Sequence, residues 1–407
     1  MASPLRLLRR AALVHVAGLA LLVAPGSAAS IPLPEDDPFY AVPKKRKLAP
    51  LANGEVLKSR EVEVSSLGLP LAVTAWQVKY KTIDVHGKPS AYVTTVMIPD
   101  SPWTGGGPRP LLSYQTAQDG ISTKCAPSYA LRTGFEAGNS GAETIAMAIA
   151  LARGWALTAP DYEGPRSEFL GAKGEARGVI DGVRAALRFD TAGFRAGTPV
   201  GLIGYSGGAL ASTLGAQLQP RYAPKLKLAG VALGGVPADI GATMRAFSGT
   251  AFGGAVAMGI AAADRSYPAA NVEQYLNQAG LAAMEASQHD CISDAVARHP
   301  FASIEDYARD PAVFGSPPVV ALLQRMSPLW FRGTPSAPVY EYHAVLDELA
   351  PIGPARALVD RFCAAGTPVQ QVEDYIGEHI TELITGYLGA MDYLQNRFDG
   401  KPPPSNC

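Results

Sequence analysis

Apolar and polar positions change their period along this chain, and the change predicts where strands and helices lie. An irregular, proline-rich lead runs from residue 31 to about 58, and segments 71–81 and 91–98 then alternate apolar and polar side chains. A period of two indicates strands, so these segments predict an opening antiparallel pair. Strands and helical patterns then alternate, with strands at 110–114, 156–160, 200–205 and 228–233 and helices at 143–153, 174–189 and 208–218. Such alternation predicts an α/β fold with a mostly parallel sheet and flanking helices.

The alternation stops between residues 237 and 334, which predicts an inserted subdomain. This stretch is far longer than an ordinary connection of a few residues, and it is rich in Ala and Gly with Met, Phe and Leu interspersed. We therefore expect a cap or lid of small helices at 237–334, inserted into a core formed by 30–236 and 335–407. The pattern resumes with strand 338–345, helix 354–364, strand 369–375 and helix 382–398.

The first residues predict an export signal. Three arginines precede an apolar run from residue 11 to 24, which is followed by Pro-Gly-Ser-Ala-Ala ending at Ala29. This pattern is typical of a secretory signal peptide, here residues 1–29, cleaved after Ala28 or Ala29. The run is too short for a membrane anchor, and the other long apolar stretch, 251–263, indicates a buried or interfacial helix. We expect a secreted, extracellular protein without stable membrane insertion.

The charge balance argues against a nucleic-acid partner. The chain has 35 Lys and Arg and 36 Asp and Glu, and loss of the three signal arginines lowers the basic count from 35 to 32 and the formal charge from −1 to −4. A mildly acidic protein lacks the basic footprint of a nucleic-acid binder. We interpret the one basic run, residues 44–47, as a solvated surface segment.

Four cysteines are present, and in an oxidising compartment they allow three disulfide pairings. Cys407 ends a proline-rich tail, where an unpaired thiol would be exposed and reactive. A bond to nearby Cys363 would pin this tail and leave Cys125 with Cys291. No second Cys or His stands at metal-ligand spacing from any of them, so we interpret the cysteines as structural.

The segment Gly204-Tyr205-Ser206-Gly207-Gly208 lies between the strand 200–205 and the helix 208–218. It has the form of a nucleophile elbow, a turn so tight that small residues are needed two positions before and two after the serine. The pentapeptide alone is weak evidence in a chain with 42 glycines. Ser206 is therefore a candidate nucleophile whose assignment depends on finding its partners.

A serine nucleophile needs a base, and the base needs an orienting carboxylate. In folds with this elbow the partners follow the serine in the order acid, then histidine. His379, directly after strand 369–375, is the one histidine in a suitable place. The others belong to the signal peptide, precede Ser206, lie in the cap or sit inside a strand, namely His15, His86, His289, His299 and His343.

The orienting carboxylate is expected after strand 338–345, where Asp347 and Glu348 are the candidates. Either residue has the alternative role of starting the helix near Pro354. We prefer Asp347, with Glu348 second, because Asp347 directly follows the strand.

An oxyanion hole requires two N–H groups aimed at the developing negative charge. Gly207, next to the serine, supplies one. The His-Gly-Gly pattern of many esterases is missing, and the glycines at 105–107 precede their strand, where a turn is expected. The loop after Tyr114 remains, with the backbone amide of Asp119 as the candidate.

Taken together, these residues resemble the secretory lipases of fungi and actinobacteria. The resemblance covers most of the chain after the signal and is weakest in the cap. It rests on seven segments: 113–115, 125–129, 161–164, 204–209, 343–344, 347–348 and 378–379. It implies an α/β-hydrolase core with a helical cap and a catalytic triad of Ser206, Asp347 and His379. It also implies oxyanion contacts from Asp119 and Gly207 and the disulfide pairs given above.

The sequence hence predicts a carboxylic ester hydrolase acting on lipid or small ester substrates, plausibly triacylglycerols at a lipid–water interface. Such chemistry needs no metal or organic cofactor. One alternative is an acyltransferase, because the same acyl-enzyme serves transfer to an alcohol. Another is a catalytically silent hydrolase fold that acts as a surface binding protein. Product analysis with a competing alcohol separates acyl transfer from hydrolysis, and activity of the purified protein with and without Ser206 tests the silent fold.

Overall fold

The computed structural model describes residues 31–66, 68–133 and 139–407. The expected signal peptide, 1–29, lies outside these residues. Among the helices that are described, none combines the length and the apolar character needed to cross a bilayer.

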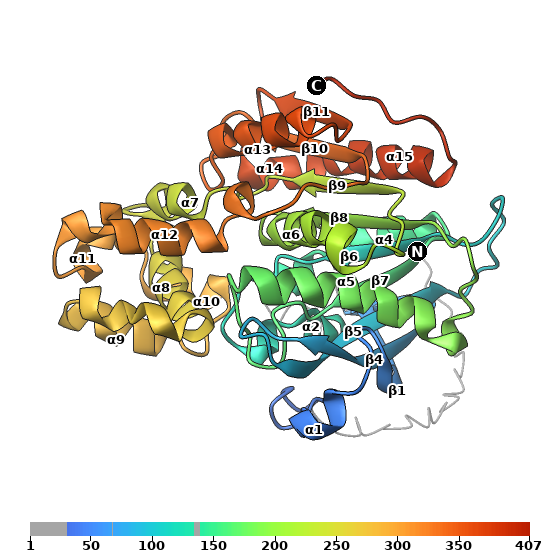
Figure 1. The fold of residues 1–407 in the computed structure, drawn as a ribbon, viewed down its shortest axis with the longest axis horizontal. Helices are drawn as coiled ribbons and strands as arrows, with labels where there is room; N and C mark the ends of the chain where they lie inside the picture. Colours follow the sequence, from blue (N-terminus) through green and yellow to red (C-terminus); the bar gives the residue numbers. More distant parts are fainter. Residues whose placement is uncertain (1–30, 67, 134–138) are drawn as a thin grey trace, which may run out of the picture. The chain divides into compact units, whose positions relative to one another are not determined.

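Within the described residues, nine strands form one sheet in the order β1-β4-β5-β7-β6-β8-β9-β10-β11 (Figure 1). The strands from β7 to β11 pair in parallel, while β1, β4 and β5 add an antiparallel edge. This is the mostly parallel sheet that the sequence predicts. The strand bounds are β1 Val56–Val62, β4 Val73–Ile83, β5 Pro89–Pro99, β6 Leu111–Gln115, β7 Ala156–Pro160, β8 Val200–Tyr205, β9 Gly230–Gly234, β10 Val339–Ala344 and β11 Val369–Asp374.

Helices cover both faces of the sheet. One face packs against α5 (Ala172–Arg188), α6 (Gly207–Tyr222) and α13 (Ile352–Ala364). The other packs against α4 (Thr144–Ala152) and α15 (Tyr387–Phe398). The central strands β6 to β9 are buried along their whole length because helices lie on both sides. Short elements complete this part: α1 Lys45–Leu48, β2 Ser65–Ser66, β3 Leu69–Pro70, α2 Pro127–Thr133, α3 Asn139–Ala142 and α14 His379–Thr385.

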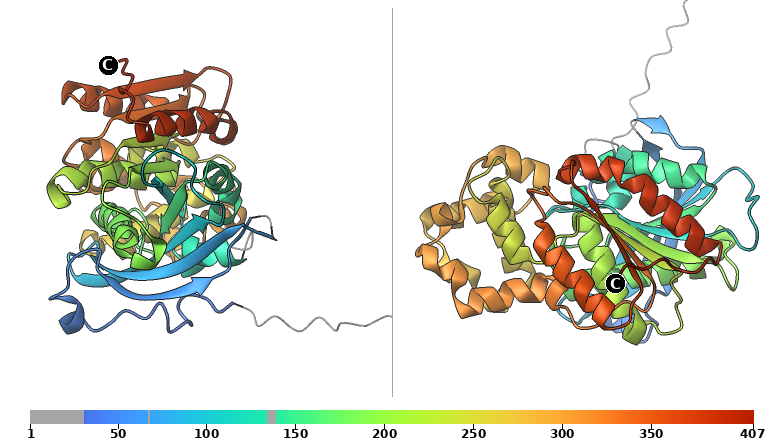
Figure 2. Two further views of the ribbon diagram at one scale, coloured as in Figure 1. Left: turned by 90° about the vertical axis from the view of Figure 1, so that its right-hand side faces the viewer. Right: turned by 90° about the horizontal axis from the view of Figure 1, so that it is seen from above.

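Between β9 and β10 the chain forms a separate group of helices, which we call the cap. Its helices are α7 Ile240–Phe247, α8 Gly254–Ser266, α9 Gln278–Ala286, α10 Ile292–Arg298, α11 Ile304–Tyr307 and α12 Pro317–Met326. Figures 1 and 2 show them gathered at one end of the sheet. These helices share an apolar core, part of which packs against α5 and α6. Most of the apolar stretch 251–263 lies in α8, which is largely buried in this core.

Two local expectations differ from the structure. The lead before residue 58 is not wholly irregular, because β1 begins at Val56 and pairs with β4 along a half-exposed edge. The single helix expected at 382–398 is two helices, α14 and α15, which meet at Gly386. A side chain at Gly386 would collide with the ring of Tyr342, so the packing there requires a glycine.

Candidate active site

The residues singled out in the sequence lie at the carboxyl ends of parallel strands. Ser206 follows β8, Asp347 follows β10, His379 follows β11, and Asp119 lies beyond the end of β6. Since parallel strands end at the same edge of a sheet, four distant segments of the chain meet there.

Ser206 stands at the turn between β8 and α6 with φ of 52° and ψ of −124°. This backbone is costly for a residue with a side chain, and small neighbours make it possible. A Cβ at Gly204 would collide with the Gly208 carbonyl, and one at Gly208 with the Gln115 carbonyl. The Ser206 N–H donates to the Gly234 carbonyl of β9 at 2.9 Å, which anchors the turn to the sheet. The segment is thus built as a nucleophile elbow.

The three side chains proposed from the sequence form a continuous chain of contacts. His379 Nε2 lies 2.9 Å from Ser206 Oγ, and His379 Nδ1 lies 2.7 Å from Asp347 Oδ2. The other carboxylate oxygen of Asp347 accepts the N–H groups of Leu349 at 2.9 Å and Ala350 at 2.6 Å. Asp347 is therefore fixed from both sides, as an orienting carboxylate requires.

Glu348 takes a different place. Its carboxylate accepts the backbone N–H of His379 at 3.3 Å and does not touch the imidazole. Of the two acids left open by the sequence, Asp347 is the one that the fold brings to the ring.

Burial alone would raise the pKa of Asp347, but hydrogen bonds from His343 and His379 hold it well below its usual range. Asp347 is consequently ionised at neutral pH. A carboxylate in this form stabilises positive charge on the neighbouring imidazole.

Tyr205 contacts His379, and the sequence did not reveal this contact. Its hydroxyl donates to the backbone carbonyl of His379, and its ring lies against the imidazole with centroids 5.2 Å apart. A tyrosine before the serine is visible in the sequence, but its contact with a loop 174 residues away depends on the fold.

Two N–H groups are available for an oxyanion. Gly207 is the first residue of α6, so its N–H has no acceptor within the helix. Within the described residues the Asp119 N–H donates to no other backbone group, and it faces the carboxyl group of its own side chain. Asp119 has φ of 36°, and its carboxyl group packs against Gly207, where any side chain would collide with it. Burial raises the pKa of Asp119 to about 7, opposed by the charge of His379.

Glu143 holds the loop that carries Asp119, a role that the sequence did not reveal. Its two carboxyl oxygens accept the Ala117 N–H at 2.6 Å and the Tyr114 hydroxyl at 2.9 Å. Burial raises the pKa of Glu143 to about 8, against the effect of these hydrogen bonds. A buried acid bonded to the loop backbone restricts how the loop can move.

The cysteines join this loop to the cap. The structure contains the disulfides Cys125–Cys291 and Cys363–Cys407, the pairs that the sequence favours. The first links the segment after Asp119 to the start of α10, and the second attaches the C-terminal tail to α13.

A cavity of about 440 Å³ opens over these groups. Ser206, His379, Asp119 and Gly207 form part of its wall, and the cap supplies apolar side chains, among them Met244, Phe247, Phe252, Met258 and Val296. An apolar cavity with a few convergent polar groups is the usual form of a small-molecule site. Within the described residues, no three His, Cys, Asp or Glu side chains are arranged to hold a metal ion.

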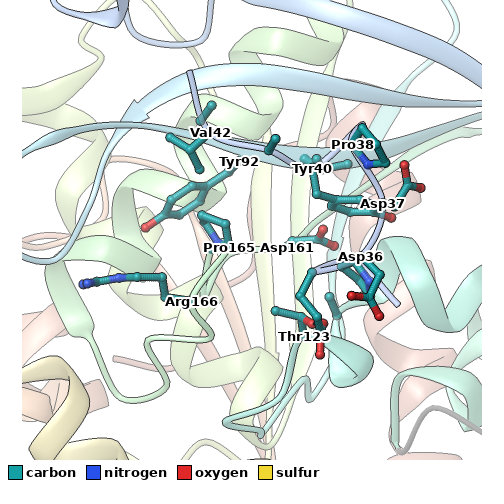
Figure 3. Close-up of a pocket in the computed structure, with 17 residues that line it drawn as sticks. Asp36, Asp37, Pro38, Tyr40, Val42, Tyr92, Thr123, Asp161, Pro165 and Arg166 are labelled. Atoms are coloured by element: carbon teal, nitrogen blue, oxygen red, sulfur yellow. The ribbon is translucent and has the colours of Figure 1, made fainter. Parts of the chain in front are cut away.

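A second cavity, of about 470 Å³, lies between the N-terminal segment and the core (Figure 3). None of the residues discussed above, Ser206, Asp347 or His379, lines it. Two of its acids already have partners, since Asp37 pairs with Arg60 at 2.6 Å and Asp161 accepts the Ser128 hydroxyl at 2.6 Å. The first cavity is therefore the better candidate for chemistry.

Comparison with known proteins agrees with this geometry. A family model described as secretory lipase matches residues 131–406. The chain belongs to the secretory lipase family. Its fold is also that of a solved family relative, Candida antarctica lipase A, with a TM-score of 0.84 and 28% identity over 93% of this chain and 89% of that one.

Relatives of this chain differ in what their names say of activity. A Mycobacterium tuberculosis protein named a probable inactive lipase is 38% identical, over 91% of this chain and 83% of its own length. Lipase 4 of Candida albicans is 32% identical, over 96% of this chain and 87% of its own length. Family membership by itself thus leaves activity to be argued from the site.

Proposed function

We propose that this protein is a secreted serine hydrolase that cleaves carboxylic esters of lipids, including triacylglycerols. One observation carries the proposal: Ser206, His379 and Asp347 are hydrogen-bonded in series, at 2.9 and 2.7 Å, and Ser206 and His379 line an apolar cavity. A hydrolase fold that only binds and does not catalyse does not require these three side chains to be hydrogen-bonded in this way.

In the first half-reaction Ser206 Oγ attacks the ester carbonyl while His379 Nε2 takes the hydroxyl proton. The resulting oxyanion accepts hydrogen bonds from the N–H groups of Gly207 and Asp119. When the tetrahedral intermediate collapses, the bond between carbonyl carbon and alcohol oxygen breaks, and His379 returns the proton to the leaving alcohol.

In the second half-reaction water attacks the acyl-enzyme and gives a proton to His379. Collapse of the second intermediate releases the fatty acid and returns the proton to Ser206. Asp347 stays ionised throughout and stabilises the imidazolium. The apolar side chains of the cap, such as Phe247 and Met258, offer the acyl chain a surface away from water.

The test is hydrolysis by the purified protein of p-nitrophenyl esters from short to long acyl chains and of emulsified triacylglycerol, beside Ser206→Ala. We expect turnover by the native protein and a loss of at least about 10³-fold in the variant. A phosphonate ester inhibitor should label Ser206 and no other residue, as read by mass spectrometry.

Two outcomes contradict the proposal. Unchanged turnover in Ser206→Ala removes the nucleophile assignment. A folded native protein that cleaves no ester and takes up no phosphonate is a binding protein instead of an enzyme. Cleavage of short esters without any action on emulsions narrows the substrate class to small esters.

A further inference from the structure

His343 lies in β10 with no exposed surface, and both of its ring nitrogens face acceptors. Nδ1 is 2.9 Å from Glu341 Oε1. Nε2 is 2.7 Å from the Ala350 carbonyl and 3.3 Å from Asp347 Oδ2. A second histidine therefore reaches the same carboxylate oxygen that His379 contacts.

This geometry determines the charge of His343. A carbonyl oxygen cannot donate, so Nε2 must carry a hydrogen to satisfy Ala350. The other oxygen of Glu341 accepts the Gln371 amide at 2.8 Å, and an ionised Glu341 pairs at Oε1 with a hydrogen on Nδ1. A neutral imidazole has one N–H, and two hydrogens make the ring a cation.

The local charges agree with this assignment. Burial by itself lowers the pKa of His343, but the hydrogen bonds to Asp347 and Glu341 raise it to about 10. Carboxylates also face the ring from the neighbouring elements: Glu373 lies beside His343 in β11, and Glu382 approaches from α14. Arg356 on α13 is a nearby cation and is paired with Glu373 at 2.7 Å, and the titratable ring of His379 on α14 faces Asp347.

We propose that His343 is a positioning residue that stays protonated during catalysis. Its charge holds Asp347 ionised and limits how strongly Asp347 attracts a proton onto His379. The inference rests on the proposed ester hydrolysis for its effect on rate, whereas the charge of His343 stands independently of any reaction.

The consequence is a shift in the pH range of activity. A positive charge at Asp347 Oδ2 disfavours a second positive charge on His379, so the base stays free to accept a proton at lower pH. The acid limb of kcat/KM reports protonation of the base in the free enzyme. With His343 in place this limb lies at lower pH than in a protein without that charge.

The first experiment compares the pH dependence of kcat/KM for a soluble ester in the native protein, His343→Gln and His86→Gln. The first variant keeps a hydrogen-bonding side chain and removes the charge. We expect its acid limb to move to higher pH by about one unit. His86 pairs with Glu168 at 3.4 Å, away from the triad, so His86→Gln should reproduce the native profile. An unmoved acid limb in a folded His343→Gln protein overturns the inference.

The second experiment observes His343 directly, by side-chain nitrogen NMR of the native protein between pH 6 and 9. In the native protein we expect hydrogens on both ring nitrogens over this whole range. In Glu341→Gln we expect the ring to lose one of these hydrogens at a lower pH than in the native protein. This arm holds even when His343→Gln does not fold. An unprotonated ring nitrogen at pH 7 in the native protein overturns the inference. Because the spectrum needs no turnover, absence of ester cleavage contradicts only the proposed function.

Discussion

The backbone carbonyl of Asp119 accepts a hydrogen bond of 2.9 Å from the N–H of Ile292, the first residue of α10. The N–H of Ile121 donates back to the Asp290 carbonyl at 2.8 Å, and the disulfide Cys125–Cys291 closes the same junction. The candidate oxyanion loop of the core is thus paired with the cap. The position of the Asp119 N–H depends on the subdomain that also lines the substrate cavity.

This junction predicts that removing the disulfide Cys125–Cys291 lowers kcat. In the double variant Cys125→Ala/Cys291→Ala we expect kcat to fall about tenfold. Complete loss of one oxyanion donor lowers kcat by about 10²–10³, and an Asp119 N–H that is less firmly held should stabilise the oxyanion only in part. Cys363→Ala/Cys407→Ala is the control. Both disulfides close long loops, so removal of either should lower the free energy of unfolding by about 4–5 kcal/mol. Equal effects of the two double variants on kcat would show that only stability matters.

Asp347 and Glu348 should differ sharply in function. Asp347→Asn leaves a side chain of the same shape that cannot stabilise the imidazolium, and we expect kcat to fall by about 10⁴. Glu348→Gln changes a carboxylate whose hydrogen bond comes from the His379 backbone N–H, and we expect kcat to change by less than about tenfold. Steady-state kinetics on a soluble ester measures both. The reverse ranking would transfer the orienting role to Glu348.

Met244 is expected to influence acyl chain length. Its side chain lines the active-site cavity and also a smaller apolar cavity of about 80 Å³ inside the cap, where it packs on Gly259. Met244→Ala should join the two spaces and shift the ratio of kcat/KM toward longer acyl chains.

Met284 is a matched control for this variant, because it is buried in the cap and lines neither cavity. Each truncation should cost about 2–5 kcal/mol of stability. The same chain-length profile in both variants would mean that Met244 does not separate the two spaces.

Exposed apolar side chains beside the cavity predict binding to a lipid–water interface. Ile380, Ile384 and Leu388 are 53%, 71% and 54% exposed, and Ile380 also lines the active-site cavity. Ile384→Ser/Leu388→Ser should lower activity on emulsified triacylglycerol while leaving kcat/KM for a soluble ester unchanged. Val42→Ser, an exposed apolar residue of the N-terminal segment, is the control. Equal losses on both substrates would argue against an interfacial role.

Stability should fall as pH rises from 5 to 10. Hydrogen bonds to Asp347 and Glu341 outweigh burial and raise the pKa of His343 from 6.5 to about 10. The stability that this provides is complete below pH 6.5 and is lost as pH rises through about 10. Burial likewise raises the pKa of Glu175 from 4.5 to about 8. Folding then keeps a proton that the unfolded chain releases, and stability falls over that range.

Thermal unfolding followed by circular dichroism at pH 5, 7 and 9 tests this dependence. His343→Gln should flatten the decline between pH 7 and 9, and His86→Gln should not. A midpoint that rises from pH 5 to 9 would contradict the assigned pKa directions.

Much of the fold was predictable because its signals are local. Strands such as 200–205 and helices such as 174–189 follow from the period of apolar residues, and the tight turn at Ser206 requires glycines at fixed positions. Gly386 shows the limit of such reasoning. Its neighbours have a helical pattern, and the close packing of Gly386 against Tyr342, which is distant in sequence, is visible only in the structure.

The site divides in the same way. The sequence alone determined an elbow at Ser206, a base at His379 and a choice between Asp347 and Glu348, because chain order and strand ends restrict which side chains can meet. Only the tertiary structure decided that Asp347 is the acid on the imidazole, that Glu143 and Ile292 hold the Asp119 loop, and that His343 shares the Asp347 carboxylate. Hydrogen bonds act over about 3 Å, and a sequence does not specify which distant groups come that close until the chain is packed.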